Sequence, residues 1–311
     1  DSDSGAGSGR LAVRLGAGLR RSTARGVTEQ TLRLEVGVDR YLLDHSIDGV
    51  PVLPMAGALS LIGEAAALAC PGFHLGRIEK LTLLSGVRLV GGSSDLVVRC
   101  SEKPGSAASR QVQVELLSGR GKPRAHYRAT VELYPSLAAV ARGIALPPPV
   151  PPTPPPLPVP ELYRRWLFHG PLFQGITAID GFTELGVSGR LRASRPAACL
   201  QGARSDDEWL IDPVLLDSAM QLAGVWSRHF AGITVLPLGC QTLLRLGAPK
   251  GTECLGRVRI VPADDPSELR CDVAVCDPDG TPVLLMLGLF GIGSAALNRL
   301  TEQPLQHRPA S

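Results

Sequence analysis

The chain has 311 residues, of which 44% are hydrophobic and 20% are charged, and its formal net charge is +3. This composition allows a large packed core, and the length indicates two domains or one large duplicated domain. The small net charge is too weak to indicate an affinity for nucleic acid or for an anionic membrane surface. The seven cysteines are odd in number and form no CxxC pair, so we interpret them as reduced core thiols of a cytoplasmic protein.

The predicted organisation is two units joined by a stiff connection. The chain starts with DSDSGAGSGR, and we expect residues 1–25 to be a flexible linker in a longer polypeptide. Two units are expected at 26–145 and 161–297. Between them, ten of the fifteen residues 146–160 are proline, which predicts an extended polyproline strut. Residues 298–311 are expected to be a flexible tail, and no segment matches a signal peptide or a membrane span.

The first unit opens with a strand-like segment at residues 32–44, directly before His45. A helix is predicted over Met55–Ala69, where almost every side chain is apolar or small, as expected for a helix buried on all sides. Strand-like segments follow at residues 77–89, 95–102, 110–118 and 124–133.

The second unit repeats this order of one helix followed by strands. A helix is predicted over Pro213–Phe230, with Asp212 as its N-cap and Pro213 at its first position. The CDPDGTP segment between the last two strands is typical of a hairpin turn. One apolar helix followed by antiparallel strands, made twice, predicts an α+β double hotdog, in which each sheet wraps round a central helix. The strand-like segments are residues 235–246, 254–261, 269–277 and 282–292.

The segment DHSIDGVPVLP, residues 44–54, places a titratable ring immediately before the first predicted helix. Gly49 permits a tight turn, and Pro54 leads into the helix, whose free N–H groups can polarise a carbonyl oxygen. A lone histidine is usually a hydrogen-bonded core residue, and the glycine and proline spacing here balances that expectation. The spacing alone therefore leaves both roles open for His45.

A possible partner for His45 lies in IDPVLLDSAMQ. Asp217 falls one turn into the second helix, and Gln221 follows four residues later on the same face. Burial among apolar side chains would raise the pKa of Asp217 and favour the protonated acid. A histidine base in one unit and an acid in the other would suit proton transfer. The alternative is that Asp217 and Gln221 only tie the helix to the sheet.

A third segment of interest is FHGPLFQG, residues 168–175. Gly170 and Pro171 predict a tight bend, and Phe173 is expected to line or support a pocket. His169 is either a second catalytic histidine or a positioning residue. The six histidines show no HxH or HxxxH spacing, so we expect no metal site.

Four motifs, in order, resemble those of dehydratase domains of type I polyketide synthases. The resemblance spans about residues 30–295. The sequences of the segments FHGPLFQGI and DGVPVLPMAGAL are more similar to dehydratase domains of iterative bacterial synthases, of the enediyne and polyunsaturated-fatty-acid types. His45, Gly49 and Pro54 match HxxxGxxxxP; Asp217 and Gln221 match DxxxQ/H; Gly170, Pro171 and Phe173 match GPxF; and Leu236, Pro237 and Leu238 resemble the LPF-type segment.

The chain departs from this family's pattern at two places. The tyrosine that usually precedes GPxF is replaced by His169, and the usual HP before the second helix is replaced by Asp212–Pro213. The first departure concerns the expected substrate pocket. By resemblance, that pocket includes His169, Gly170, Pro171, Phe173, Leu236 and Pro237.

The resemblance implies removal of water from a β-hydroxyacyl thioester, which arrives on the phosphopantetheine arm of an acyl carrier protein, to give an enoyl thioester. His45 would be the base and Asp217 the acid, with no bound cofactor or metal. The expected partners are the carrier protein, other domains of the synthase and a second copy in a homodimer. A double-bond isomerase or cyclase, a hotdog thioesterase and a non-catalytic carrier-docking module remain open. Gly49, Pro54 and Gln221 would be positioning residues, and Arg164, Arg165 and Arg228 would be candidates for carrier docking.

Overall fold

The computed structural model describes residues 10–11, 19–22, 26–103, 108–119, 123–140 and 143–301. Most of the expected N-terminal linker, and residues 302–311 of the expected tail, lie outside the described residues. Two short strands fall within the linker range, β1 (Arg10–Leu11) and β2 (Leu19–Ser22).

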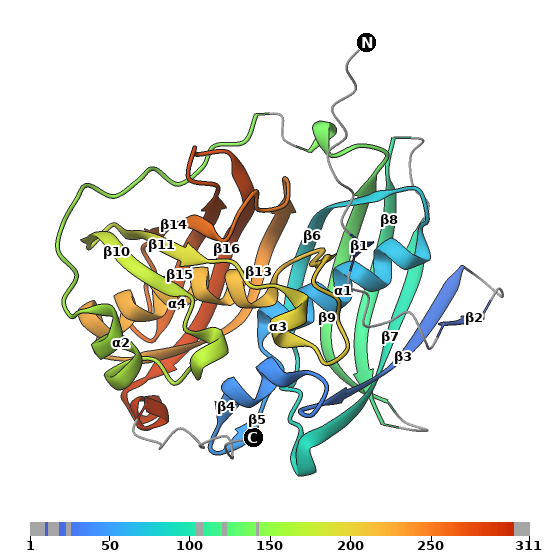
Figure 1. Cartoon of the computed structure of the whole chain (residues 1–311), viewed down its shortest axis with the longest axis horizontal. Coiled ribbons are helices and arrows are strands. Elements are labelled where there is room, and N and C mark those ends of the chain that lie inside the picture. Colours follow the sequence, from blue (N-terminus) through green and yellow to red (C-terminus); the bar gives the residue numbers. More distant parts are fainter. Residues whose placement is uncertain are drawn as a thin grey trace.

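Twelve strands of the described part of the chain form one continuous antiparallel sheet. From one edge of the sheet to the other, the C-terminal half contributes β10-β11-β14-β15-β16-β13, and the N-terminal half continues with β6-β9-β8-β7-β3-β2. The two halves lie side by side, and each curves round one helix (Figure 1). The bounds are β3 (Val27–Glu35), β6 (His74–Leu83), β7 (Ser93–Lys103), β8 (Arg110–Ser118), β9 (Arg124–Tyr134), β10 (Ile176–Thr183), β11 (Gly186–Arg192), β13 (Thr234–Arg245), β14 (Glu253–Val261), β15 (Glu268–Cys276) and β16 (Pro282–Ser294).

The two central helices have the predicted bounds, α1 (Met55–Ala69) and α4 (Pro213–Phe230). Helix α1 packs on β6, β7, β8 and β9, α4 packs on the strands of the other half, and the two helices contact each other. Every residue of α1 from Met55 to Ala66 is buried, which explains why this helix has no polar face. The predicted double hotdog is confirmed. The remaining elements are β4 (Ser46–Ile47), β5 (Val50–Pro51), β12 (Asp207–Glu208), α2 (Val159–Arg165), α3 (Pro196–Cys199) and the 3₁₀ helices η1 (Arg40–Asp44), η2 (Val90–Gly92), η3 (Leu137–Ala139), η4 (Pro171–Phe173) and η5 (Ala295–Thr301).

The core also agrees with the interpretation of the cysteines. All seven are buried and free. None of the helices in the described part of the chain combines the length and hydropathy that crossing a membrane requires.

One predicted strand is wrong in its second part. Strand β3 ends at Glu35, and the chain then forms η1 before His45. The cause is a turn at Asp39, whose backbone N–H donates to the Glu35 carbonyl at 2.7 Å and whose carboxylate accepts from the Glu35 N–H at 2.9 Å. These bonds end the strand pairing. His45 is therefore reached through a 3₁₀ turn and not from a strand end.

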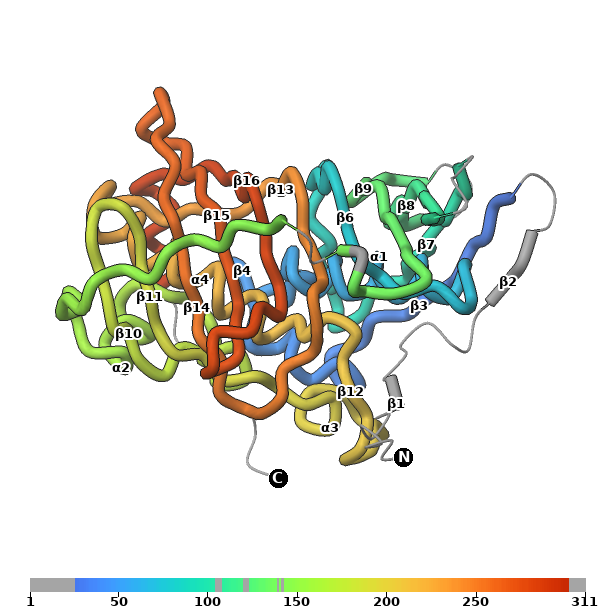
Figure 2. The backbone as a smooth tube through the Cα atoms, turned by 90° about the horizontal axis from the view of Figure 1, so that it is seen from above, coloured from blue at the N-terminus to red at the C-terminus, as the bar shows by residue number. Residues whose placement is uncertain are grey.

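Strands β10 and β11 were not predicted from the sequence, because their glycines and polar residues resemble a loop. The proline-rich segment is hydrogen-bonded to these strands and runs across the C-terminal half to α2 (Figure 2). The Val150 N–H donates to Ser188 Oγ at 2.8 Å, and the Thr153 N–H donates to the Asp180 carbonyl at 3.3 Å. The expected strut is thus attached along one side, and α2 starts at Val159, one residue before the predicted end of the strut.

The ordered chain continues past the predicted boundary at residue 297. Residues 298–301 belong to η5, where Leu300 is buried. Asn298 Oδ1 accepts a hydrogen bond from Thr234, and Arg299 forms an ion pair with Asp48 at 3.0 Å. These contacts hold the first part of the expected tail against both halves.

The two halves of the sheet join through β13 and β6, with Gly239 paired to Thr82 and Cys240 paired to Leu81. A Cβ atom on Gly239 would lie 2.2 Å from the Leu81 carbonyl oxygen, a backbone atom that cannot swing away. We expect Gly239→Ala to lower the free energy of unfolding by about 1–3 kcal/mol, because the strands must separate locally. Chemical denaturation measures this change.

Gly247→Ala is the matched control, since its Cβ would meet only the Pro282 carbonyl at 3.8 Å. Its free energy of unfolding should stay within about 0.5 kcal/mol of the parent. Equal stability of the two variants would contradict the close approach at the β13–β6 junction.

Candidate active site

A cavity of about 250 Å³ lies where the two halves meet. Its walls come from both, since α1 and the segment before it lie on one side and α4, β13 and β16 lie on the other. The sequence-predicted residues that line it are His45, Pro54, His169, Asp217, Gln221, Leu236 and Pro237.

Four other predicted residues do not line the cavity. Gly49 lies in the exposed turn between β4 and β5 with φ of +72°, which explains the need for glycine there. Phe173 is fully buried and supports the site from behind, between the rings of Tyr41 and His45. Gly170 and Pro171 shape the approach, and a Cβ on Gly170 would lie 2.5 Å from the Asp44 carboxylate.

The ring of His45 is held in one orientation. Its Nδ1 lies 2.8 Å from the Val52 carbonyl oxygen, and the backbone N–H of Val52 donates to the His45 carbonyl at 2.9 Å. A carbonyl can only accept, so Nδ1 carries the proton and Nε2 keeps a lone pair. Desolvation by burial lowers the pKa of His45 to about 4, with a further lowering by His169 and an opposing effect of Asp217. The ring is therefore a neutral base.

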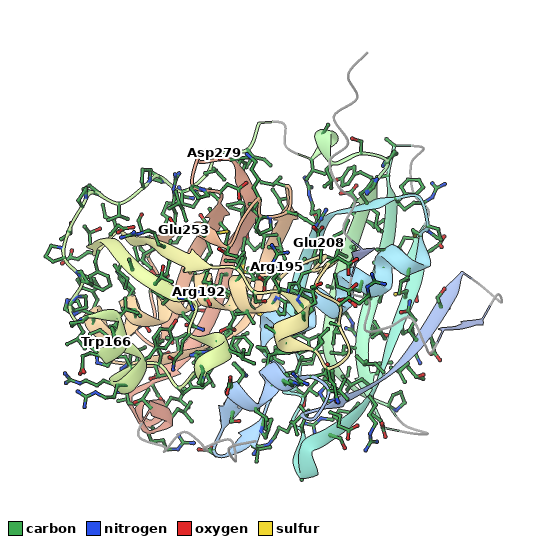
Figure 3. The ribbon with its side chains drawn as sticks, in the orientation of Figure 1. Trp166, Arg192, Arg195, Glu208, Glu253 and Asp279 are labelled. Atoms are coloured by element: carbon green, nitrogen blue, oxygen red, sulfur yellow. The ribbon has the colours of Figure 1, made fainter. Side chains whose placement is uncertain are left out.

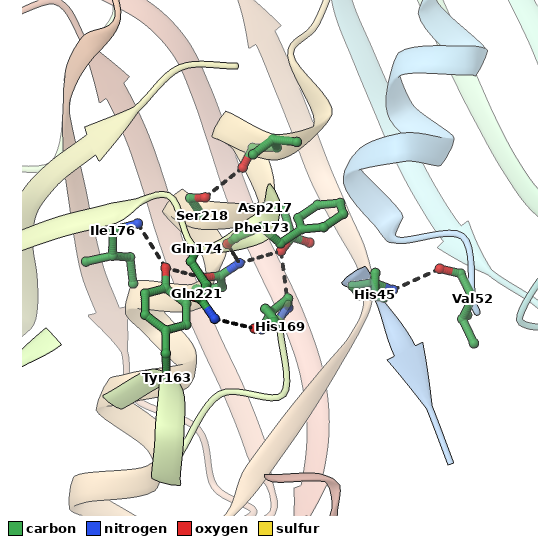
Figure 4. A network of polar contacts seen from close by, with 11 residues as sticks. His45, Val52, Tyr163, His169, Phe173, Gln174, Ile176, Asp217, Ser218 and Gln221 are labelled. Carbon is green, nitrogen blue, oxygen red and sulfur yellow. Dashed lines mark hydrogen bonds and ion pairs between the residues drawn. The ribbon is translucent and has the colours of Figure 1, made fainter. Parts of the chain in front are cut away.

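A chain of hydrogen bonds orients Asp217 from the other half (Figure 4). Gln221 Nε2 donates to Asp217 Oδ2 at 2.8 Å and to the Phe173 carbonyl at 2.9 Å. Gln221 Oε1 in turn accepts from the Tyr163 hydroxyl at 2.9 Å. No sequence motif indicated Tyr163, because it lies in α2 and reaches the site only through Gln221.

His169 lies between the two predicted catalytic residues. Its Nε2 is 3.2 Å from Asp217 Oδ2, and its ring centroid is 5.5 Å from that of His45. The ring stacks on Phe168 with a centroid distance of 4.2 Å. His169 is 7% exposed, so its interaction with Asp217 is shielded from water.

The expected pKa of Asp217 is the main correction at the site. Burial by itself raises it, as expected from the sequence, but three other effects outweigh burial. These are the hydrogen bond from His169, the electrostatic interactions with the His169 and His45 rings, and the hydrogen bond from Gln221, and together they lower the pKa below its usual value. These neighbours therefore favour the carboxylate form of Asp217.

The N-terminus of α1 faces the cavity through Pro54 and Met55. Proline at the N-cap offers no side-chain acceptor, so within the described residues this helix start has no side-chain cap. Helix α4 differs, because Asp212 accepts from the N–H groups of Val214 and Leu215 and confirms the predicted cap. The first turn of α1 can therefore offer N–H groups to a ligand oxygen.

The rest of the cavity is mainly apolar and includes large side chains that no motif indicated. Trp166 lies at the end of α2 (Figure 3). Of the three arginines considered for docking, Arg228 lines the cavity, whereas Arg164 and Arg165 are exposed on α2. The additional lining residues include Ile47, Val52, Leu83, Tyr127, Leu167, Phe168, Met220, Leu269, Leu289 and Phe290.

The folded chain brings together a set of metal-type ligands that the histidine spacing did not reveal. One ring nitrogen each of His45 and His169 and one oxygen of Asp217 lie within 4.8 Å of one another. Two histidines and a carboxylate are suitable ligands for a divalent transition metal. The three residues come from separate segments of the chain, so no local spacing pattern in the sequence indicates this cluster.

The chain is similar to known proteins in parts of its sequence and in its fold. Residues 142–290 match the family model described as "Polyketide synthase dehydratase N-terminal domain". The C-terminal half of the chain is therefore similar to polyketide synthase dehydratase domains. The match covers the C-terminal half with Asp217, and His45 lies outside it.

One relative is a polyunsaturated fatty acid synthase protein of Thraustochytrium sp., which is 30% identical over 206 residues. The alignment covers 66% of this chain and 7% of that protein, so the chain corresponds to a small part of the relative.

Solved dehydratase structures share the fold. The dehydratase domain of the polyketide PpsC from Mycobacterium tuberculosis is 22% identical, with a TM-score of 0.68 and coverage of 89% of this chain and 96% of that chain. The dehydratase domain from the CurJ module of curacin polyketide synthase is 15% identical, with a TM-score of 0.68 and coverage of 89% and 95%.

The geometry predicts that the imidazole of His45 stays neutral, with its proton on Nδ1, down to a pH near its pKa of about 4. In the unfolded chain, where burial is lost, histidine titrates near pH 6.5. Two-bond ¹H–¹⁵N correlation spectra of the histidine rings across this pH range check the prediction. The same titration in denaturant is the control, and protonation of His45 near 6.5 in the folded protein would contradict it.

Proposed function

We propose that this chain is the dehydratase domain of a polyketide or polyunsaturated-fatty-acid synthase. Its substrate would be a β-hydroxyacyl thioester on an acyl carrier protein, and its products an enoyl thioester and water. The observation that carries the proposal is the pairing of His45 from one half with Asp217 from the other across a mainly apolar cavity. We also propose residues 26–145 and 161–297 as its two hotdog units.

The base in this reaction is His45. Its lone pair on Nε2 takes a proton from C2 of the thioester, and the Val52 carbonyl stabilises the positive charge that forms on the ring. A neutral imidazole is required for this step, and burial supplies it by lowering the pKa of His45. The electrons of the C2–H bond first delocalise onto the thioester carbonyl, and they form the C2–C3 double bond as the C3–O bond breaks.

The thioester oxygen gains negative charge as the C2 proton leaves. The uncapped first turn of α1, next to Pro54 and Met55, is the place in the cavity where N–H groups can bind that oxygen. This assigns the oxyanion site to the helix start and not to Gly49, which lies in an exposed turn. The C3–O bond then breaks, and the oxygen takes a proton from Asp217, the proposed acid, and leaves as water.

The lining supports an acyl chain as the bound group. Leu83, Met220 and Leu289 are apolar walls that can cover methylene groups. Arg228, a cation in the lining, suits the phosphate of a phosphopantetheine arm, and Arg164 and Arg165 suit the acidic surface of a carrier protein. Other synthase domains, a homodimeric partner and a cytoplasmic location belong to the same proposal, which involves no bound cofactor.

The test is mass spectrometry of a 3-hydroxyacyl carrier protein after incubation with the domain. The parent protein should remove one water. His45→Ala and Asp217→Asn should each lower the rate by about 10²–10⁴, the usual contribution of one general acid–base group. His74→Ala and Asp180→Asn are matched controls, because both residues are exposed and lie outside the cavity.

The product distinguishes the alternatives. A free acid would identify a thioesterase, and an unchanged mass with a shifted double bond would identify an isomerase. Full activity of either site variant, or an unchanged substrate at several chain lengths, would overturn the proposed function.

A further inference from the structure

Helix α4 presents one line of side chains and backbone to the cavity. Four of its residues line the cavity and, at intervals of four, three and four positions, share one helix face: Asp217, Gln221, Gly224 and Arg228. The helical rise places Asp217 and Arg228 about 16 Å apart along the axis. The proposed acid is therefore at one end of this line, a cation is at the other end, and a glycine lies between them.

Gly224 is an unfavourable residue for the interior of a helix. Glycine destabilises a helix relative to alanine, because its backbone loses more conformational freedom on folding. The backbone conformation does not require it, since α4 is one regular helix from residue 213 to 230 and Gly224 has no positive φ. The reason for a glycine at this position must therefore lie in the surroundings of the helix.

Close packing does not require Gly224 either. Among the described residues, and apart from its chain neighbours and the backbone of α4, a Cβ atom at this position would meet only Leu167 Cδ2, at 3.7 Å. This is an ordinary van der Waals distance. Gly63, in the interior of α1, is different, because its Cβ would lie 2.7 Å from Leu75 Cδ2. Gly63 is thus explained by the contact between helix and sheet, whereas Gly224 faces free space.

The free space beside Gly224 is part of the cavity. Gly224 and Leu167 both line it, from opposite sides. The wall at Leu167 is held in place, because this side chain is buried and its backbone N–H donates to the Leu162 carbonyl at 3.0 Å, at the end of α2. A side chain at position 224 would therefore narrow the cavity between α4 and Leu167.

The position of Gly224 along the cavity indicates what passes it. At the C-terminal end of α4, the lining residues Trp166, Arg228 and Val235 are partly exposed, so this end of the cavity lies at the surface. Arg228 Nη1 donates to Thr234 Oγ1 at 3.1 Å, which orients the cation at that end. A thioester beside Asp217 would be connected to a phosphate beside Arg228 by an uncharged chain of methylene and amide groups. That chain needs width and no counter-charge where it passes Gly224.

We propose that Gly224 is a specificity-determining residue, which keeps the cavity wide enough for the phosphopantetheine arm between the thioester and its phosphate. This rests on the proposed dehydratase function. The helix loses stability at Gly224, and the arm gains a passage. Gly224 lies about 10 Å along the helix from Asp217. An N-acetylcysteamine thioester keeps only the first amide of the arm, so it ends before Gly224 and does not depend on this passage.

The first experiment measures stability without substrate. Gly224→Ala should raise the Tm by about 1–3 °C, because alanine favours the helix and its methyl group meets no obstacle. Gly63→Ala is the matched control and should lower the Tm, since Leu75 must move. Differential scanning calorimetry measures both changes. A lower Tm for Gly224→Ala would mean that the fold itself requires the glycine, and it would overturn the proposal.

The second experiment compares one 3-hydroxyacyl group on the carrier protein and on N-acetylcysteamine. In Gly224→Leu, the new side chain would lie over the preceding turn of α4 and fill the cavity near Met220. The kcat/KM for the carrier-bound substrate should fall at least about tenfold more than that for the truncated thioester, mainly through KM. Gly63→Ala should change both values by the same factor.

Two results of this comparison would contradict the proposal. An equal loss with both thioesters in Gly224→Leu would show a general disturbance of the site. A loss that grows with acyl chain length on both thioesters would place the acyl chain, and not the arm, beside Gly224.

The third experiment separates failure of this inference from failure of the proposed function. Free 4′-phosphopantetheine is titrated into the protein and its binding is followed by calorimetry. The parent protein and Gly63→Ala should bind it equally, and Gly224→Leu should bind it at least about tenfold more weakly. If the parent dehydrates no substrate but this pattern is found, the proposed reaction is wrong and the role of Gly224 stands. Equal binding by Gly224→Leu, or no binding by the parent, overturns the role of Gly224 whatever the protein catalyses.

Discussion

The antiparallel pairing of β13 with β6 is the constraint on which the site depends. It joins the two halves into one sheet and fixes the distance between their central helices. His45 enters from one half and Asp217 and His169 enter from the other, so none of the proton-transfer geometry exists in either half alone. A small residue at Gly239 lets the strands approach closely there. The backbone pairing and the α1–α4 contact together fix the separation of His45 and Asp217, the proposed base and acid.

Burial affects the two sides of the cavity in opposite ways. On the His45 side, the loss of water keeps a single ring neutral. On the Asp217 side, the same loss of water strengthens the interaction of a carboxylate with its histidine neighbour. One low-dielectric cavity can therefore hold a neutral imidazole and a hydrogen-bonded carboxylate close together. His45 and Asp217 differ in charge because their neighbours differ, although both side chains are buried.

The fold could be predicted well from the sequence because the strongest signals are local. Helices α1 and α4 are bounded by Pro54 and by the Asp212–Pro213 cap, and those signals are readable without a structure. The position of η1, the glycine-rich strands β10 and β11 and the attachment of Val150 were not predictable, because side-chain bonds and contacts with distant residues decide them. The candidate site shows the same division. The spacing of DxxxQ placed Asp217 and Gln221 on one helix face, but the pKa of Asp217 was expected in the wrong direction, since it depends on His169, which a loop brings in from outside the helix. A motif records the residues at a site, whereas their protonation depends on neighbours that the fold supplies.

The strand order has a further consequence. From the β13–β6 junction outwards, the N-terminal half begins β6-β9-β8-β7 and the C-terminal half begins β13-β16-β15-β14, which is the same winding about an approximate two-fold axis. If two identical chains were joined at this edge, each catalytic residue would be present in both of them. Because the two halves are parts of one chain, their sequences can differ, and each half can carry different catalytic residues. In the proposed mechanism one half retains the proton acceptor and the other the proton donor, and the cavity is single and asymmetric.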